Sequence, residues 1–257
     1  MSTEQNAGPW IAEVLSCTPA AENIMRLEVL VPHQALEHAV PGQFADFLVP
    51  DDPGWHVLRR PLSLAGIDLD NNRAVFYFRC DGPGTRILAQ VRPGQELNVL
   101  MPLGRGYTAP RPEEQIWLVG GGTGAAAVLA VPSFYQAGFT LFLGFQTNEQ
   151  IFGFAEAADA DLVLACDSSG VLVTDLVEEA LEEGRRPDRI LACGPMPMYR
   201  ALAKVARGIP TEISLEERMG CGTGGCQACE ARVGGRMVRT CSDGPVFPME
   251  EVDGIAD

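Results

Sequence analysis

The chain is poor in basic residues and in long apolar runs. It has 19 Lys and Arg against 34 Asp and Glu, a formal net charge of -15 over 257 residues, which makes nucleic acid and anionic membranes unfavourable partners. No apolar run approaches the length that crosses a bilayer, and the polar N-terminus lacks a basic region followed by an apolar stretch. We therefore expect a cytoplasmic protein that binds neither nucleic acid nor membrane.

Histidine is also scarce, and this limits the chemistry open to the chain. His33, His38 and His56 lack the spacing of metal ligands, and no Ser-His-Asp arrangement is readable. The acidic residues at 178–183 fall on the outer face of an expected helix, where a solvated surface explains them better than an acid/base pair. We expect no catalytic side chain on this chain.

Cysteine, in contrast, is concentrated near the C-terminus. Cys221, Cys226, Cys229 and Cys241 are separated by four, two and eleven residues, and a glycine-rich loop carries the first two. Four thiolates at these intervals suit a 2Fe-2S cluster, because such a loop can wrap around the inorganic sulfides and aim backbone N–H groups at sulfur. A zinc site is the alternative, but it normally uses two Cys-x2-Cys pairs, and only one is present.

The first hundred residues predict an antiparallel barrel. Short stretches of alternating polarity occur at 10–14, 25–29, 44–48, 74–78 and 96–100. Turn-forming dipeptides such as Pro41-Gly42 and Pro93-Gly94 separate them, and short strands broken by turns in this way favour a closed barrel. A further strand is expected to include the apolar segment 55–58 and to end at the motif that begins with Arg60.

From Gln115 the sequence alternates between strands and helices. Strands are expected at 116–119, 140–145, 161–165 and 189–192, with helices at 125–130, 174–183 and 197–206. This alternation is typical of a doubly wound parallel sheet, and a stretch rich in proline and charge precedes it. We predict a β plus α/β protein in three parts, which are an antiparallel barrel domain at 1–110, a parallel-sheet nucleotide domain at 111–209 and a small cluster segment at 210–257.

Two motifs of the barrel region could bind a flavin. Arg60-Pro61-Leu62-Ser63 combines an arginine that can pair with a pyrophosphate and a hydroxyl that can reach the reactive edge of the ring. Further along, Gly82-Pro83-Gly84-Thr85 could cap phosphates at the start of a helix over 86–90. Each motif also has an ordinary explanation, as surface arginine or as a capped turn.

Two loops of the second region lie where a parallel sheet binds nucleotides. Gly120-Gly121-Gly122-Thr123-Gly124 follows the first expected strand, and Cys193-Gly194-Pro195 follows the strand at 189–192. The glycine loop is not a strict G-x-G-x-x-G, so it does not name its ligand. The second loop lacks bulky side chains and would allow a nicotinamide to approach, although it could equally be a turn with an idle cysteine.

In this order, the motifs resemble those of the ferredoxin reductase superfamily. Within it, 214–226 and 241–247 are similar to the cluster loop and closing motif of the electron-transfer subunits of NAD-dependent dihydroorotate dehydrogenase B. The resemblance implies FAD bound by Arg60, Pro61, Leu62, Ser63, Phe76, Tyr77, Phe78, Gly84 and Thr85, NAD as co-substrate at the two loops of the second region, and a 2Fe-2S cluster on Cys221, Cys226, Cys229 and Cys241. It also implies a partner subunit with FMN and the dihydroorotate site, usually in a two-plus-two heterotetramer.

These cofactors together predict an electron-transfer subunit. Nicotinamides exchange two electrons as hydride, a 2Fe-2S cluster passes one at a time, and a flavin converts between the two. We therefore expect electrons to pass from the partner's FMN through the cluster and FAD to NAD+, in pyrimidine biosynthesis. Two alternatives stay open, namely a homologous subunit of another NAD(P)H-linked oxidoreductase of ferredoxin or sulfite reductase type, and a non-catalytic zinc-binding interaction module.

Overall fold

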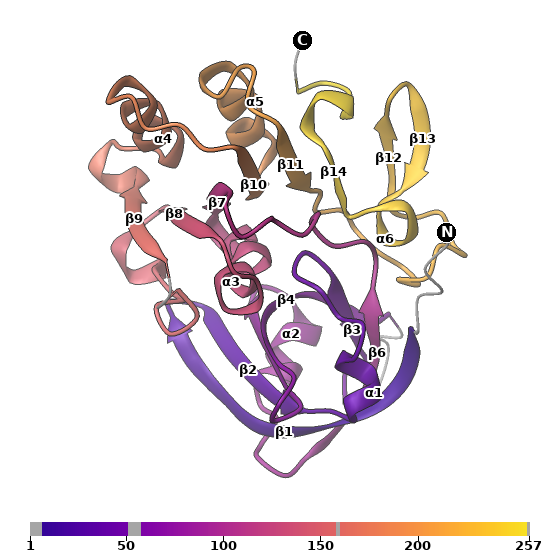
Figure 1. Cartoon of the computed structure of the whole chain (residues 1–257). Helices are drawn as coiled ribbons and strands as arrows, with labels where there is room; N and C mark the ends of the chain where they lie inside the picture. The colour runs from indigo at the N-terminus through magenta and orange to yellow at the C-terminus, as the bar shows by residue number, and fades with distance from the viewer. Residues whose placement is uncertain (1–6, 51–57, 158–159, 256–257) are drawn as a thin grey trace.

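The computed structural model describes residues 7–50, 58–157 and 160–255. A barrel forms one end of the molecule, a sheet flanked by helices lies above it, and the C-terminal segment packs beside both (Figure 1). None of the described helices is long and apolar enough to cross a membrane.

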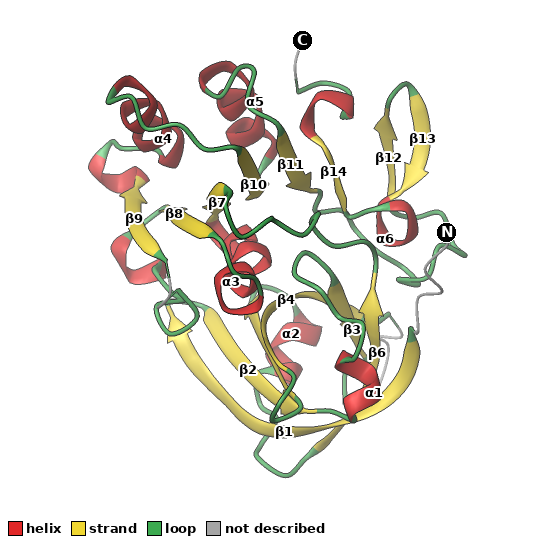
Figure 2. Cartoon of the chain, in the orientation of Figure 1, coloured by secondary structure: helices red, strands yellow, loops and turns green. Residues whose placement is uncertain are grey.

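Six antiparallel strands close the barrel in the order β1-β2-β5-β4-β3-β6 (Figure 2). The strands are β1 (Gly8–Ala21), β2 (Ile24–Leu30), β3 (Phe44–Phe47), β4 (Arg60–Asp68), β5 (Arg73–Arg79) and β6 (Glu96–Leu103), with two short helices, α1 (His33–Leu36) and α2 (Pro83–Leu88), between them. Inward side chains fill the interior, and Phe47 packs edge-on against Phe76 with ring centroids 4.9 Å apart. The alternating polarity of the strands thus produces the predicted barrel.

The arginine motif begins a strand rather than ending one, which corrects the expected boundary. Arg60 pairs with Phe47, and Ser63 pairs with Phe44, so the whole motif forms the first half of β4. The reason is the alternation of Leu62 and Leu64, whose side chains enter the barrel core and continue the inward face of the strand. Of the apolar segment 55–58, only the last residue lies within the described residues.

The second layer is a six-stranded sheet in the order β14-β11-β10-β7-β8-β9. Its strands are β7 (Gln115–Gly121), β8 (Gly138–Phe145), β9 (Asp161–Cys166), β10 (Arg189–Cys193), β11 (Thr211–Ser214) and β14 (Val246–Pro248). All neighbours are parallel except β14, which runs antiparallel to β11 at the edge. The doubly wound parallel sheet predicted from the strand-helix alternation is confirmed.

Helices cover both faces of this sheet. They are α3 (Ala125–Phe134), α4 (Val173–Glu182) and α5 (Met196–Val205), with 3-10 turns η1 (Gly122–Gly124), η2 (Asn148–Gln150), η3 (Asp167–Ser169) and η4 (Met249–Glu251). Helix α3 lies between the sheet and the barrel, whereas α4 and α5 lie on the far face (Figure 1). The far helices are amphipathic, since each packs on the sheet with one side and meets solvent with the other.

The C-terminal segment forms a hairpin and a short helix but also extends the sheet. The hairpin is β12 (Glu230–Val233) with β13 (Arg236–Arg239), and the helix is α6 (Thr240–Asp243). Both β11 and β14 come from the range 210–257 and belong to the parallel sheet. The predicted limits of the three parts therefore stay a prediction, because this range contributes to two of them.

The barrel and the sheet share one hydrophobic core around α3. Ala65 and Val75 of the barrel lie in the same buried cluster as Ala126 and Leu129 of the helix and Leu118 of the sheet. A helix that is buried on two sides needs apolar residues all round, and the sequence of α3 provides them. This shared core fixes the orientation of the two layers.

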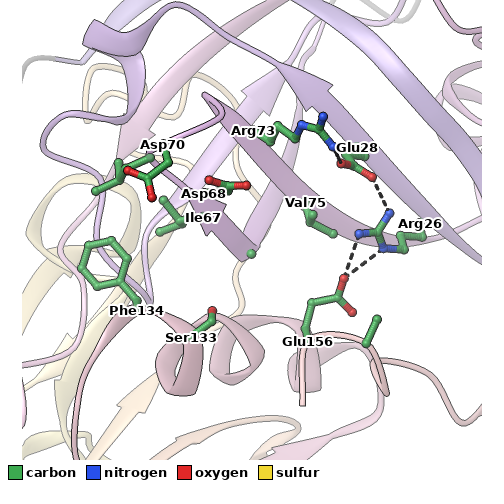
Figure 3. Close-up of a pocket in the computed structure, with 13 residues that line it drawn as sticks. Arg26, Glu28, Ile67, Asp68, Asp70, Arg73, Val75, Ser133, Phe134 and Glu156 are labelled. Carbon is green, nitrogen blue, oxygen red and sulfur yellow. Dashed lines mark hydrogen bonds and ion pairs between the residues drawn. The ribbon is translucent and has the colours of Figure 1, made fainter. Parts of the chain in front are cut away.

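A charged contact joins the two layers at the edge of that core. Arg26 of β2 donates from Nε to Glu156 Oε1 at 3.0 Å, and the hydroxyl of Tyr77 donates to Glu156 Oε2. Figure 3 shows Glu156 reaching from the loop before β9 toward Arg26, which also pairs with Glu28 at 2.9 Å. The group borders an open cavity of about 610 Å³. Because the side chain of Glu156 is only 8% exposed, we expect this contact to contribute to stability.

Replacing Glu156 by alanine should lower the free energy of unfolding by about 2 kcal/mol, because it leaves Arg26 and the Tyr77 hydroxyl without their shared acceptor. The measurement is urea unfolding followed by fluorescence. As a control, Glu183→Ala removes an exposed pair with Arg185 and should change stability by less than about 0.5 kcal/mol. Equal effects of the two substitutions would contradict this account.

Candidate functional site

The four C-terminal cysteines meet where the C-terminal segment packs against the barrel. Cys229 and Cys241 are each 2% exposed and form a small apolar cluster with Phe44 of β3 and Leu103 of β6. Helix α6 places them together, because the N–H of Cys241 points at the sulfur of Cys229, at 3.4 Å. Cys221 and Cys226 lie on the glycine loop, and Cys226 is exposed.

Backbone amides of this loop point at the cysteine sulfurs. The N–H groups of Thr223 and Cys226 each lie 3.4 Å from the sulfur of Cys221, and that of Gly224 lies 3.2 Å from the sulfur of Cys241. Burial raises the pKa of Cys221, but these amides outweigh burial and bring the pKa to about 6. The loop is therefore built to hold sulfur as thiolate.

The folding of the loop depends on left-handed backbone at two glycines. Gly222 has a φ of +68° and Gly224 a φ of +83°, conformations that disfavour any side chain. Among the described side chains, no three His, Cys, Asp or Glu residues form a ready-made site for a metal ion. The chemistry of the donor set, four thiols with amides directed at sulfur, is what fits an iron-sulfur cluster here.

The two barrel motifs meet at the start of α2. The guanidinium of Arg60 lies directly over Gly84, so that a Cβ at Gly84 would collide with it. Thr85 caps the helix, accepting from the N–H of Gly82 at 3.2 Å. Within the described ranges, Arg60 donates to the carbonyls of Leu58 and Arg59 and to no acidic side chain. This placement of a guanidinium at the start of a helix suits a pyrophosphate.

Three of the residues expected at the flavin are buried in the protein. Phe76 is fully buried and Phe78 is 3% exposed, both inside the barrel core, and Tyr77 packs against Phe152 with ring centroids 4.6 Å apart. Their side chains face other protein groups, so any contact of this strand with a flavin would come from its backbone. For these three positions, a backbone contact with the flavin stays a prediction.

A second cavity, of about 410 Å³, opens at the carboxyl edge of the sheet. The ends of β7 and β8 and the starts of α4 and α5 line it, together with residues from the barrel and from the segment after β11: Arg79, Gly121, Gly122, Thr123, Gly144, Phe145, Gln146, Gln150, Asp167, Leu172, Val173, Thr174, Pro195, Pro197, Met198, Ala201 and Glu216. Parallel sheets bind nucleotides at this edge. Its place and size suit a nicotinamide nucleotide reaching toward the barrel.

The two expected nucleotide loops divide their residues between this cavity and the core. Four of their residues line the cavity, namely Gly121, Gly122, Thr123 and Pro195, whereas Gly120, Gly124, Cys193 and Gly194 are not part of its wall. A Cβ at Gly124 would lie 2.6 Å from the carbonyl oxygen of Cys193, so these glycines let the loops touch each other. Some residues of each motif therefore line the cavity, and the others let the two loops pack together.

A hydrogen-bond network holds the second loop in place. The hydroxyl of Tyr199 donates to the carbonyl of Ser214 at 2.6 Å and accepts from the N–H of Gly194 at 2.9 Å. Tyr107, from the segment after the barrel, donates to the carbonyl of Ala192 at 3.1 Å. Cys193 is fully buried beneath the loop, and burial raises the pKa of its thiol well above the usual value. Cys193 is thus a neutral packing residue.

Two charged residues of the cavity were not predicted to bind a nucleotide. Arg79 ends β5 of the barrel, and Glu216 follows β11 of the sheet, yet both line the same cavity. Glu216 is accessible to solvent in the cavity but is surrounded by protein, and this burial raises its pKa, while Arg79 acts in the opposite direction. Arg79 directly follows the strand predicted at 74–78, which could have identified it, whereas no strand was predicted before Glu216.

Comparisons with known proteins agree with this arrangement. Residues 216–253 match the family model described as the iron-sulfur cluster binding domain of dihydroorotate dehydrogenase B. A dihydroorotate dehydrogenase B (NAD(+)) electron transfer subunit from Geobacillus thermodenitrificans is 41% identical over 82% of this chain and 86% of its own length. Another from Lysinibacillus sphaericus is 36% identical over 91% of this chain and 95% of its own.

The chain belongs to the family of electron-transfer subunits of dihydroorotate dehydrogenase B. Among solved structures, this family member is similar to the NADH-dependent reduced ferredoxin-NADP oxidoreductase, with a TM-score of 0.80 and 28% identity over 94% of this chain and 89% of the other. Phthalate dioxygenase reductase has a TM-score of 0.63 and 16% identity over 88% and 87% of the two chains, which shows the fold alone. The predicted family and fold class are confirmed.

In this family member, we expect Gly124→Ala to lower the free energy of unfolding by about 2 kcal/mol, because its Cβ would press on backbone that cannot move aside. The measurement is again urea unfolding. Gly82→Ala is the control, since the nearest atom to its Cβ is the Thr85 hydroxyl at 4.0 Å, and it should cost well under about 1 kcal/mol. A stable Gly124→Ala protein would contradict the close packing of the two loops.

Proposed function

We propose that this chain passes electrons between the FMN of a dihydroorotate dehydrogenase catalytic subunit and NAD+, using a 2Fe-2S cluster and FAD. The observation that carries the proposal is the placement of three candidate sites around one barrel. The cysteine loop packs on β3 and β6, the arginine motif begins β4, and Arg79 at the end of β5 reaches the nucleotide cavity. When bound, the flavin would exchange hydride with the nicotinamide and single electrons with the cluster.

Cys221, Cys226, Cys229 and Cys241 are the proposed ligands of the cluster. The amides directed at Cys221 and Cys241 support this assignment, because they stabilise the anionic sulfur of a metal-bound thiolate. Burial of Cys229 and Cys241 would exclude water from one side of the cluster, while the exposed Cys226 would leave the other side near the surface. Such a site can receive an electron from a partner that docks over the loop.

The proposed flavin contacts are Arg60, Pro61, Leu62 and Ser63 on β4, with Gly84 and Thr85 at α2 and the backbone of 76–78. The arginine over Gly84 supports them, since a glycine there lets a phosphate come close to the helix start. Arg60 would neutralise the pyrophosphate. Ser63, the half-buried fourth residue of β4, would contact the flavin ring.

The nicotinamide nucleotide is proposed to enter the cavity at the carboxyl edge of the sheet. Gly121, Gly122 and Thr123 would contact the nucleotide on one side, with Gly120 and Gly124 supporting them. Pro195 would contact it on the other side, with Cys193 and Gly194 as its support. Thr123 and the loop amides would bind phosphate, and Arg79 would add a positive charge in a chain whose net charge is -15. Small residues in the second loop would leave room for the flat nicotinamide ring.

The partner is proposed to be an FMN-containing dihydroorotate dehydrogenase subunit, in a two-plus-two heterotetramer located in the cytoplasm. Family membership supports a partner of this kind, because the relatives are electron transfer subunits of dihydroorotate dehydrogenase B. The partner would have to dock close to the cluster, because the rate of electron transfer between two centres falls steeply with the distance between them.

The first test is the cofactor content of the chain, purified without oxygen. We expect flavin bands with broad iron-sulfur absorption, and about two irons and one FAD per chain. A colourless chain with zinc would overturn the proposal. The Cys226→Ser variant should lose dihydroorotate-dependent reduction of NAD+ in the presence of the FMN subunit, yet keep NADH-dependent reduction of an artificial dye. Loss of both activities with the fold intact would contradict the proposed order of centres.

A second test concerns Arg60. Arg60→Ala should weaken FAD binding by at least about tenfold, because a charge-assisted hydrogen bond to the pyrophosphate is lost. The measurement is fluorescence titration of flavin-free protein with FAD. Arg86→Ala is the matched control, because Arg86 is an exposed arginine on α2, the helix whose start lies beneath Arg60, and among the described residues it hydrogen-bonds only the carbonyl of Asp81. Equal losses in the two variants would argue against a specific role for Arg60.

A further inference from the structure

A buried carboxylate lies between the candidate flavin site and the candidate cluster site. Asp46 of β3 is 1% exposed, and its Oδ1 has no hydrogen-bond partner among the described residues. Burying a carboxylate oxygen without a hydrogen-bond partner is costly, so such a group is seldom kept without a role. Neither the family comparison nor the cysteine motif assigns one to Asp46.

The position of Asp46 follows from the way β3 is covered on both faces. Ala45 and Phe47 point into the barrel core, while Phe44 and Asp46 belong to the opposite face of the strand. The C-terminal segment covers that outer face, where Phe44 packs with Cys229 and Cys241. Asp46 is therefore buried against the cluster segment and not inside the barrel.

The carboxylate contacts the cysteine loop directly. A Cβ at Gly222, which follows Cys221, would lie 2.7 Å from Asp46 Oδ2, so the glycine lets the loop rest on the carboxylate. On the other side, Arg59 donates to the main-chain carbonyl of Asp46 at 3.0 Å, and Arg60 of the flavin motif is close enough to influence its charge. Asp46 thus stands between two positive groups and the loop.

The charge state of Asp46 is set by opposing effects. Burial raises the pKa of Asp46, Arg59 and Arg60 lower it, and Cys221 raises it, so that the pKa lies above its usual range. The two arginines favour the ionised form of the carboxylate, whose Oδ2 faces Gly222 of the cysteine loop. The negative charge is held in a region from which solvent is excluded, where its field is weakly screened.

We propose that the carboxylate of Asp46 holds the reduction potential of the cluster lower than a neutral side chain would at this position. This inference rests on the proposed function. Adding an electron to a cluster beside a buried negative charge is unfavourable, and local charge is one of the factors that set cluster potentials. A lower potential favours release of the electron from the cluster toward its acceptor.

The test compares the potentials of the holo protein with Asp46→Asn and with a matched control. Asp68→Asn makes the same chemical change at the end of β4, on the cavity of Figure 3 and away from the cysteine loop. Each protein is titrated at pH 8 with the reduced cluster followed by electron paramagnetic resonance. For Asp46→Asn we expect the ratio of reduced to oxidised cluster at a fixed potential to rise on the order of tenfold, which is about 59 mV for one electron.

Each outcome decides the inference. An unchanged potential in Asp46→Asn, or an equal shift in Asp68→Asn, would overturn it while leaving the proposed function intact. If Asp46→Asn retained FAD but lost iron, Asp46→Glu would decide, since recovery of iron at the wild-type potential supports a role for the charge and absence of recovery overturns it. A wild-type chain without iron would overturn the proposed function, and this inference with it.

Discussion

The burial of α3 between the barrel and the sheet is the constraint on which the rest of the structure depends. Its apolar residues pack against β4 and β5 on one side and against β7 and β10 on the other, so the two layers cannot rotate without exposing the core. This fixed geometry brings Arg79, at the end of a barrel strand, to the carboxyl edge of the sheet. A cavity that needs residues from both layers exists only because their orientation is fixed.

The second structural constraint is the double burial of β3. A four-residue strand is short, yet both of its faces are covered, one by the barrel core and one by the cysteine segment. In the pairing with β6, the register shift between Phe44 and Asp46 places the extra residue on β6, so β3 itself keeps its alternation. The outer face of β3 is therefore the surface on which the C-terminal segment packs, and the barrel determines where the cysteine loop lies.

Periodicity and spacing predicted most of the architecture and the cysteine site. The barrel strands show alternation, the helices α4 and α5 show one apolar face, and the four cysteines lie within 21 positions of each other in the sequence. Two elements of the sheet escaped prediction, because β14 has three residues and β11 has four, too few for a periodic signal. The start of β4 was also missed, since a strand that begins with Arg60-Pro61 has no apolar alternation at its first residues.

The sites were harder to predict than the fold, because their residues come from distant parts of the chain. Glu216 and Arg79 share one cavity but are separated by more than half of the sequence, and the glycine motif gives no sign of which glycines line a ligand and which only allow packing. Local charge shows the same dependence on tertiary structure. A chain of net charge -15 places Arg60 and Arg79 where anionic cofactor groups are proposed to bind, and a buried carboxylate beside the cysteine loop. The interaction between charges weakens with distance and is screened by solvent. The electrostatic potential at each site therefore depends on these few nearby residues more than on the net charge of the chain.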